Sequence, residues 1–115
     1  FASNQLRLMI TLHTGETVGC VDLFDFDPKN KRAGLGVLID PVFRSKGLAR
    51  EALLLTISYG FDLLELHGFY AEVLSSNESS QRLFESTGFT KTGMKKEWLW
   101  TGDNFVDQIF YQILR

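Results

Sequence analysis

The sequence predicts an α+β fold: a mixed, mostly antiparallel sheet that contains one parallel βαβ unit. Residues 5–40 hold three runs in which apolar and polar residues alternate, with turn residues between the runs. From residue 48 the apolar spacing changes to three and four, and residues 69–74 alternate again. Strand, helix and strand in this order form a right-handed unit with two parallel strands. No linker or repeat divides the chain, so residues 1–115 are expected to form a single domain.

Composition excludes several classes of protein. The chain has 115 residues, 44% of them hydrophobic and 13% aromatic, which indicates one globular domain rather than a disordered chain. A formal net charge of −2 gives no basic field for nucleic acid, and no apolar run reaches the roughly 20 residues that cross a membrane. Cys20 is the single cysteine, so no internal disulfide is expected and a reducing, cytoplasmic location fits. His13 and His67 have no further metal ligands near them in sequence, so no metal site is expected.

The first part of the chain predicts three antiparallel strands joined by short turns. Residues 5–13 alternate, and "TGE" at 14–16 leads into a second strand at 17–26. "DPKNK" at 27–31 has the residues of a turn and leads into a third strand at 32–40. One face of this third strand carries Ala33, Leu35, Val37 and Ile39, and the other carries Gly34 and Gly36. Glycines on a strand face often mark a bulge or the close approach of another group.

The second part predicts a long helix, a strand, a short helix and a terminal hairpin. The long helix runs from Leu48 to a stop at Gly68, and its expected buried stripe is Leu48, Ala52, Leu55, Tyr59, Leu63 and Leu66. The strand at 69–74 follows, and then a short helix at 78–87. Residues 92–100 and 106–114 form the hairpin, joined by "TGDN".

The stretch "DPVFRSKGLAREALL" at 40–54 predicts an anion site at the start of the long helix. The first amide groups of a helix have no partner within the helix, and this end carries partial positive charge. Gly47 permits a tight turn and a close approach, while Arg44, Lys46 and Arg50 add positive charge. Such an arrangement suits phosphate. It is neither a Walker loop nor a dinucleotide fingerprint, and an ordinary basic turn before a helix is the alternative.

Two segments resemble those of a known superfamily. "RSKGLA" at 44–49 fits R-x-x-G-x-A and is similar to the pyrophosphate loop of the GNAT superfamily of acetyl-CoA-dependent N-acetyltransferases. "NESSQRLFESTGF" at 77–89 resembles the superfamily's N-x-x-S/A…G-F segment, and "YGFDLLELHGFYAEV" resembles the helix–strand connection of bacterial members. The resemblance covers about residues 5–115 and is closest to the branch with spermidine/spermine and ribosomal-protein N-terminal acetyltransferases.

The resemblance implies a three-layer GNAT-like fold whose central sheet is opened by a splayed strand. The sequence starts at what resembles the second strand of that fold. The first strand and the two helices that help to shape the acceptor site are therefore expected to be missing here.

The resemblance also implies acetyl-CoA as co-substrate and places its parts. The pantetheine arm is expected to pair with the backbone of Val37, Leu38 and Ile39. The pyrophosphate is expected at the backbone amides of the loop, helped by the charge of Arg44; these amides belong to Ser45, Lys46, Gly47, Leu48, Ala49 and Arg50. Asn77 either bonds the arm, directly or through water, or caps the short helix.

Catalysis is expected to involve a backbone amide of Leu38 or Ile39 that bonds the thioester carbonyl. Many relatives have a general base, a Glu, where this chain has Gly34; Asp22 and Glu72 are alternatives, or else plain strand carboxylates. Polyamine-acetylating relatives have an acidic Tyr where this chain has Phe84, which then contacts the pantetheine or the core. Ser80, one turn earlier, is either the acid that protonates the leaving thiolate or a capping serine.

The expected function is transfer of acetyl from acetyl-CoA to a primary amine of a polyamine or a protein N-terminus, by direct attack in a ternary complex. The alternative is a non-catalytic module that binds or senses acyl-CoA, because Gly34 and Phe84 replace the usual proton-transfer groups. The exposed first strand and the "EWLW" hairpin suggest pairing with another subunit, a homodimer in the simplest case.

Overall fold

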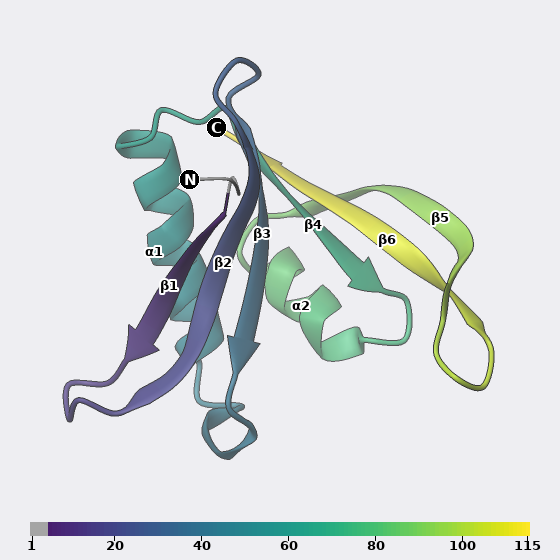
Figure 1. Cartoon of the computed structure of the whole chain (residues 1–115), viewed down its shortest axis with the longest axis horizontal. Helices are drawn as coiled ribbons and strands as arrows, with labels where there is room; N and C mark the ends of the chain where they lie inside the picture. The colour runs from purple at the N-terminus through teal and green to yellow at the C-terminus, as the bar shows by residue number, and fades with distance from the viewer. Residues whose placement is uncertain (1–4) are drawn as a thin grey trace.

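The structure is a computed structural model that describes residues 5–115. Six strands form one sheet in the order β1-β2-β3-β4-β6-β5 (Figure 1). The strands are β1 (Leu6–Thr11), β2 (Thr17–Asp27), β3 (Arg32–Ile39), β4 (Gly68–Leu74), β5 (Thr90–Trp100) and β6 (Phe105–Leu114). The helices are the short 3₁₀ helix η1 (Pro41–Phe43), α1 (Leu48–Asp62) and α2 (Glu78–Ser86). The predicted order of elements is confirmed.

The parallel pair predicted within the sheet is β3 with β4, and it is very short. Residues Arg32–Gly34 pair with Gly68–Tyr70, whereas the other neighbouring strands are antiparallel. Beyond Gly34 and Tyr70 the two strands diverge, and Figure 1 shows the wedge that opens between their arrowheads. The predicted splayed strand is thus β3, and the split divides the sheet into a β1–β3 half and a β4–β6 half.

The two α-helices, α1 and α2, pack on one face of the sheet, and the hydrophobic core lies between them and the sheet. The side chains of the core come from both halves of the sheet and from both helices, among them Leu35, Leu53, Ile57, Phe69, Phe84 and Tyr111. Cys20 is also buried. Residues 5–115 therefore form two of the three layers that the resemblance implies.

The predicted buried stripe of α1 is wrong at Leu55, Tyr59 and Leu63, whereas Ala52 packs against the core. The buried residues of this helix are Leu53, Thr56, Ile57 and Gly60, whereas Leu55 and Leu63 are 66% and 71% exposed. The reason is the close contact at Gly60, where a Cβ would lie only 2.7 Å from Phe69 Cε2. If the helix were rotated about its axis to bury Leu55 and Leu63, it would lose this contact. The sequence alone could not select the rotation, because the leucines of α1 are spaced so that several helical faces could be the buried one.

The helix α1 also ends earlier than predicted, at Asp62. The Leu63 amide donates to the Tyr59 carbonyl, and Glu65 then takes a left-handed conformation with φ of 54°. This turn brings Leu66 into the core, where it is 1% exposed. Leu66 was predicted to be buried, but it is buried as a loop residue.

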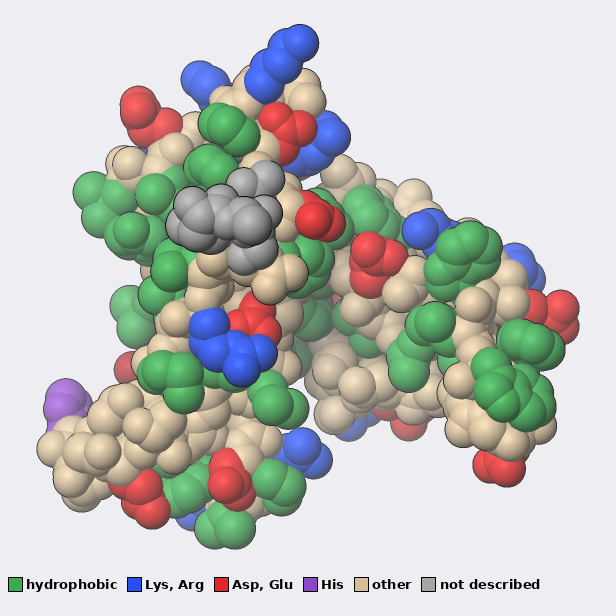
Figure 2. Space-filling view, in the orientation of Figure 1, with side chains coloured by type: hydrophobic (Ala, Val, Ile, Leu, Met, Phe, Trp, Pro, Cys, Tyr) green, Lys and Arg blue, Asp and Glu red, His purple; other side chains and the backbone are tan. Residues whose placement is uncertain are grey.

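The opposite face of the sheet has no helix on it within residues 5–115. Phe24, Gly34, Tyr70 and Phe110 lie on this face, one on each of four neighbouring strands in the order β2, β3, β4 and β6. Figure 2 shows the molecule from this side, with a notch between the two halves of the sheet. None of the helices in the described part of the chain is long and apolar enough to span a membrane.

Candidate functional site

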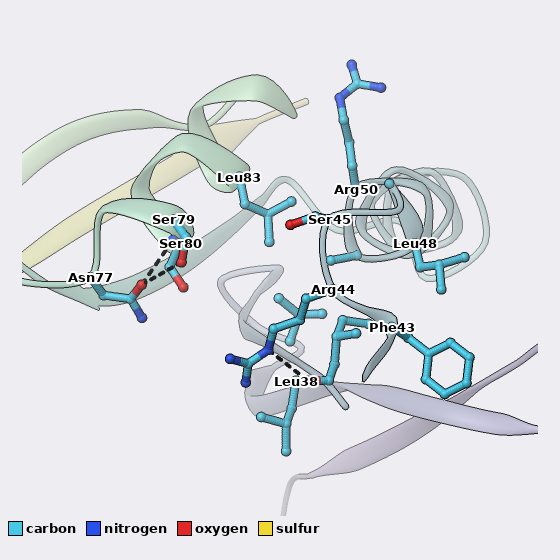
Figure 3. A pocket seen from close by; sticks show the side chains of 14 residues that line it. Leu38, Phe43, Arg44, Ser45, Leu48, Arg50, Asn77, Ser79, Ser80 and Leu83 are labelled. Atoms are coloured by element: carbon cyan, nitrogen blue, oxygen red, sulfur yellow. Dashed lines mark hydrogen bonds between the residues drawn. The ribbon is translucent and has the colours of Figure 1, made fainter. Parts of the chain in front are cut away.

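A cavity of about 460 Å³ lies at the carboxyl end of β3, on the helix side of the split (Figure 3). Its walls are the end of β3, the loop into α1, the first turn of α1 and the first turns of α2. The lining residues are Val37, Leu38, Ile39, Phe43, Arg44, Ser45, Gly47, Leu48, Ala49, Arg50, Asn77, Ser79, Ser80 and Leu83. Most residues predicted for the cofactor site are thus brought together here.

Two of the predicted residues do not line this cavity. Lys46 is exposed on the loop. Phe84 is 4% exposed and packs in the core, with its ring centroid 5.1 Å from that of Phe89 and 6.5 Å from that of Tyr111. Of the two surroundings considered for Phe84, the structure therefore shows the core. The helix α2 turns Leu83 toward the cavity instead, since it lies three residues after Ser80 on the same helical face.

The loop before α1 leaves the helix N-terminus open. Gly47 is the N-cap residue with φ of 76°, and no side chain caps the first amides of the helix. A Cβ at Gly47 would have no atom within 4 Å, so the space above this residue is free. Ser45 also has a positive φ, 63°, which tightens the turn. The unpaired amides and the positive end of α1 therefore face a space that an anion can enter.

Two arginines flank this open end and point in different directions. Arg44 is tethered to the end of β3, because its Nε donates to the Ile39 carbonyl over 3.2 Å. Figure 3 shows its guanidinium lying across the cavity on the side of Asn77 and Leu38. Arg50 points away from the cavity in this view, and its Nη2 donates to the Ser86 carbonyl over 3.4 Å. Arg44 is thus the cation placed to meet an anion inside the cavity.

The opposite wall is the capped start of α2. Asn77 Oδ1 accepts from the Ser80 amide over 3.1 Å and from Ser79 Oγ over 3.0 Å, so the capping role of Asn77 is confirmed. A bond from Asn77 to a ligand stays a prediction. The Ser79 hydroxyl is used in this cap. The Ser80 hydroxyl makes no hydrogen bond among the described residues, and Ser80 lines the cavity.

Tyr111, on the face of the sheet against which α2 packs, holds this helix in place. This buried tyrosine of β6 donates its hydroxyl to Glu85 Oε2 over 2.6 Å. Burial, and then the bond to Glu85, raise the pKa of Tyr111 to about 12. The hydroxyl therefore stays protonated at neutral pH and keeps the cavity wall fixed to the sheet.

The edge of β3 supplies the third wall. Beyond Gly34 this strand has no β4 partner, so the backbone amides of Val37 and Ile39, which face that side, are available to a ligand. An extended ligand with amide groups can pair with such an edge as a strand would. The Leu38 amide, predicted as a backbone donor, faces β2 instead, because the Asp40 amide two residues on donates to the Val18 carbonyl and backbone amides alternate sides along a strand. Of the two predicted donors, Ile39 is the one whose amide faces this edge.

The structure narrows the choice of general base. The space beside Gly34, where relatives are expected to carry Glu, is filled by the ring of Phe24. Asp22 is held by Arg7, with Arg7 Nε 2.7 Å from Asp22 Oδ1 and Arg7 Nη2 3.0 Å from Oδ2. The hydrogen bond from Arg7 lowers the pKa of Asp22, which makes it a weaker base. Glu72 is not held in this way.

The cavity combines an open helix N-terminus, a nearby guanidinium, an unpaired strand edge and a free hydroxyl. The first two features are suited to phosphate, the third is suited to amide groups, and the last can donate a proton. Phe43, Ser79 and Leu83 also line the cavity although they were not predicted. The helical spacing from Ser80 could have indicated Leu83, whereas the turn of η1 that places Phe43 has no comparable sequence signal.

Comparison with known proteins gives a consistent result. Residues 2–90 match the family described as acetyltransferase (GNAT) domain. The chain is 34% identical to spermidine N(1)-acetyltransferase of Escherichia coli K12 over 69% of this chain and 42% of that protein. It is 31% identical to the uncharacterized N-acetyltransferase YoaA of Bacillus subtilis, over 89% of this chain and 58% of YoaA. The chain therefore spans about half the length of the curated relatives it matches.

Comparison with solved structures points to the same family. A spermidine N-acetyltransferase of Vibrio cholerae, in complex with CoA and spermine, superposes with a TM-score of 0.92 at 25% identity. This match covers 96% of the present chain and 66% of the Vibrio chain. A structure of the Vibrio enzyme is also described as dodecameric.

Proposed function

The chain belongs to the acetyltransferase (GNAT) family, and from this premise we propose that it transfers an acetyl group from acetyl-CoA to a primary amine, in the first place that of a polyamine. The observation that carries the proposal is the cavity at the split, where the open N-terminus of α1 and the unpaired edge of β3 meet. A diphosphate and an amide-containing arm, joined in one molecule, match these two walls.

The binding roles follow from the walls of the cavity. The backbone amides from Ser45 to Arg50 would hold the diphosphate, with Arg44 as counter-charge. The backbone of residues 37–39 would pair with the pantetheine amides. Acetyl-CoA is a co-substrate here, and it supplies the thioester that reacts.

Acetyl transfer then needs three events. The acceptor ammonium loses a proton, the neutral amine attacks the thioester carbonyl, and the carbon–sulfur bond breaks. The backbone amide of Ile39, which faces the unpaired edge of β3, would stabilise the oxyanion. Ser80, whose hydroxyl makes no other bond among the described residues, would pass a proton to the departing thiolate.

A polyamine is the first choice of acceptor because the Escherichia coli relative is named for spermidine and the Vibrio structure contains spermine. A protein N-terminus offers the same chemical group and is the second choice. We place the reaction in the cytoplasm, where a chain with one buried cysteine is stable without disulfides.

The test is CoA release by the protein with spermidine, spermine and short peptides as acceptors, and acetylated product identified by mass spectrometry. Ser80→Ala is expected to lower kcat on the order of 100-fold without weakening CoA binding. Ser86→Ala, on the same helix, is the control and should keep wild-type turnover, since its hydroxyl only bonds the Leu83 carbonyl.

A non-catalytic acyl-CoA-binding module is the second candidate, favoured by Gly34 and Phe84 in place of a Glu and a Tyr. CoA binding by calorimetry without any acetylated product would support the module. Wild-type turnover of Ser80→Ala would remove Ser80 as the acid but leave the transfer reaction in place.

A further inference from the structure

A second cavity, of about 500 Å³, lies on the face of the sheet without helices. Its floor is made by side chains of β4 and β6, chiefly Tyr70, Glu72, Phe110 and Gln112. Arg32 and His67 lie at the end where β4 begins. The two cavities are therefore on opposite faces of one sheet, and none of the residues that line the first lines the second.

Aromatic rings give the second cavity a fixed apolar wall. The ring of Tyr70 stacks on that of Phe110, with centroids 5.3 Å apart and an interplanar angle of 14°. Phe24 meets Tyr70 edge-on, at 5.9 Å and 88°. Tyr70 donates its hydroxyl to Asp25 Oδ2 over 2.9 Å. Such a wall suits the carbon chain of an alkyl amine and can attract its positive charge.

Glu72 occupies the end of this cavity nearest the split. It follows Tyr70, the last β4 residue paired with β3, by two positions and so lies on the same face of β4. Its carboxylate meets Lys95 Nζ at 3.8 Å, a contact too long for a hydrogen bond, and 32% of its side chain is exposed. Glu72 thus lies on β4 beyond the last residue that pairs with β3, and its carboxylate is held loosely.

The other carboxylates on this face are already engaged. Asp22 is held by two bonds from Arg7. Asp25 accepts the Tyr70 hydroxyl. Among the carboxylates of β2, β3 and β4 described here, Glu72 combines a place in the cavity wall with a carboxylate that is not fixed by a hydrogen bond.

We propose that Glu72 receives the ammonium group of the acceptor and removes its proton, directly or through one water, while Tyr70 and Phe110 hold the adjoining carbon chain. This inference rests on the proposed function and deepens it, because it assigns the acceptor subsite and the missing general base.

The proton balance is complete. The ammonium gives one proton to the Glu72 carboxylate, and the amine lone pair forms a bond to the thioester carbon. The second proton lost by the nitrogen goes to the thiolate as the carbon–sulfur bond breaks. The products are the N-acetyl amine and CoA, and Glu72 returns its proton to solvent.

The test compares Glu72→Gln with the wild type in the presence of spermidine and of a short peptide, from pH 6 to pH 10. The titratable groups beside Glu72 are Lys95 on β5 and Tyr70 on β4, and Tyr70 in turn lies near Asp25 on β2 and Arg32 on β3. At pH 7, kcat/KM of Glu72→Gln is expected to fall about 100-fold. The loss should shrink toward pH 10, because free alkyl amines deprotonate by themselves near their pKa of about 10.4.

Two controls separate this role from a structural one. Lys95→Met removes the same ion pair but keeps the carboxylate, so it is expected to lower the KM for a cationic acceptor rather than to reduce kcat. Glu16→Gln changes an exposed glutamate in the β1–β2 turn and should behave as the wild type. A loss in Glu72→Gln that does not vary with pH, or the same loss in Lys95→Met, would overturn the proposal.

The outcomes for the two proposals are distinct. If the wild type releases no CoA with any acceptor, the proposed transfer reaction fails. If the wild type turns over and Glu72→Gln has the same kcat/KM throughout the pH range, only the assignment of Glu72 fails. Calorimetry with CoA should give the same affinity for both proteins, since Glu72 lies outside the first cavity.

Discussion

The aromatic ring of Phe24 occupies the space where a side chain at Gly34 would lie. A Cβ at this position would lie 2.6 Å from Phe24 Cζ and 2.7 Å from Cδ2. Phe24 in turn touches Tyr70, and Tyr70 stacks on Phe110. Gly34 is therefore the point on which a row of rings across three strands depends.

A Gly34→Ala variant is expected to be less stable by about 1–3 kcal/mol, because the new methyl group must displace the Phe24 ring from a packed position. Urea unfolding followed by circular dichroism measures this difference. Gly36→Ala is the matched control on the same face of β3, since its Cβ would meet nothing closer than Phe24 Cε1 at 3.9 Å. Equal stability of the two variants would contradict the packing role of Gly34.

Single residues of the first cavity could be predicted where a motif fixes the backbone. The loop motif predicted that Arg44, Ser45 and Gly47 lie together, and all three line this cavity, since a strand, a tight turn and a helix leave little freedom. The surroundings of Phe84 were left between two choices, because Phe84 and Leu83 are adjacent apolar residues of a short helix. Only packing against Phe89 and Tyr111 decides between them.

Among the elements, the start of α1 has the most direct link to function. Gly47→Glu is expected to abolish CoA binding in calorimetry, because a carboxylate would enter the open space above the helix N-terminus and repel phosphate. Retained affinity would contradict the assignment of the loop.

The variant also strains a residue that has a positive φ, and this effect needs its own control. Gly15→Glu is suitable, since Gly15 has φ of 92° and no atom within 4 Å of a Cβ. It lies in the β1–β2 turn and does not line the cavity. It is expected to cost similar stability, about 1 kcal/mol or more, while CoA affinity stays at the wild-type value.

Strands were easier to predict than the orientation of the long helix. Alternation along β3 placed Ala33 and Leu35 on the buried face, because a strand offers only two faces. In α1, leucines occur at so many positions that the spacing fits more than one stripe. The contact between Gly60 and Phe69, which lie in different elements, selects the correct one.

At the scale of the whole molecule, the order of elements and the split of the sheet could be predicted, whereas the second cavity could not. That cavity depends on rings from β2, β4 and β6, and no sequence spacing relates these strands. The number of chains in the assembly is also a property of the whole molecule, and it depends on the residues exposed at the surface rather than on those in the core.

The far end of the β5–β6 hairpin exposes Trp98, Trp100 and Phe105 by 56%, 60% and 57%. Figure 2 shows apolar side chains gathered at that end of the molecule. We expect this surface to contact another copy of the chain, because large apolar side chains exposed side by side mark an interaction surface. Light scattering after gel filtration should give a mass of two or more chains, and Trp100→Lys should lower it. A monomeric wild type would contradict the expectation.

The short β3–β4 ladder has a consequence for kinetics. Beyond Gly34 and Tyr70 the two strands no longer pair, and one cavity lies on each face of the sheet, so that neither reactant has to pass the other on its way in. Donor and acceptor are then free to arrive in either sequence. Double-reciprocal plots of initial velocity would intersect, whereas a covalent acetyl-enzyme would make them parallel.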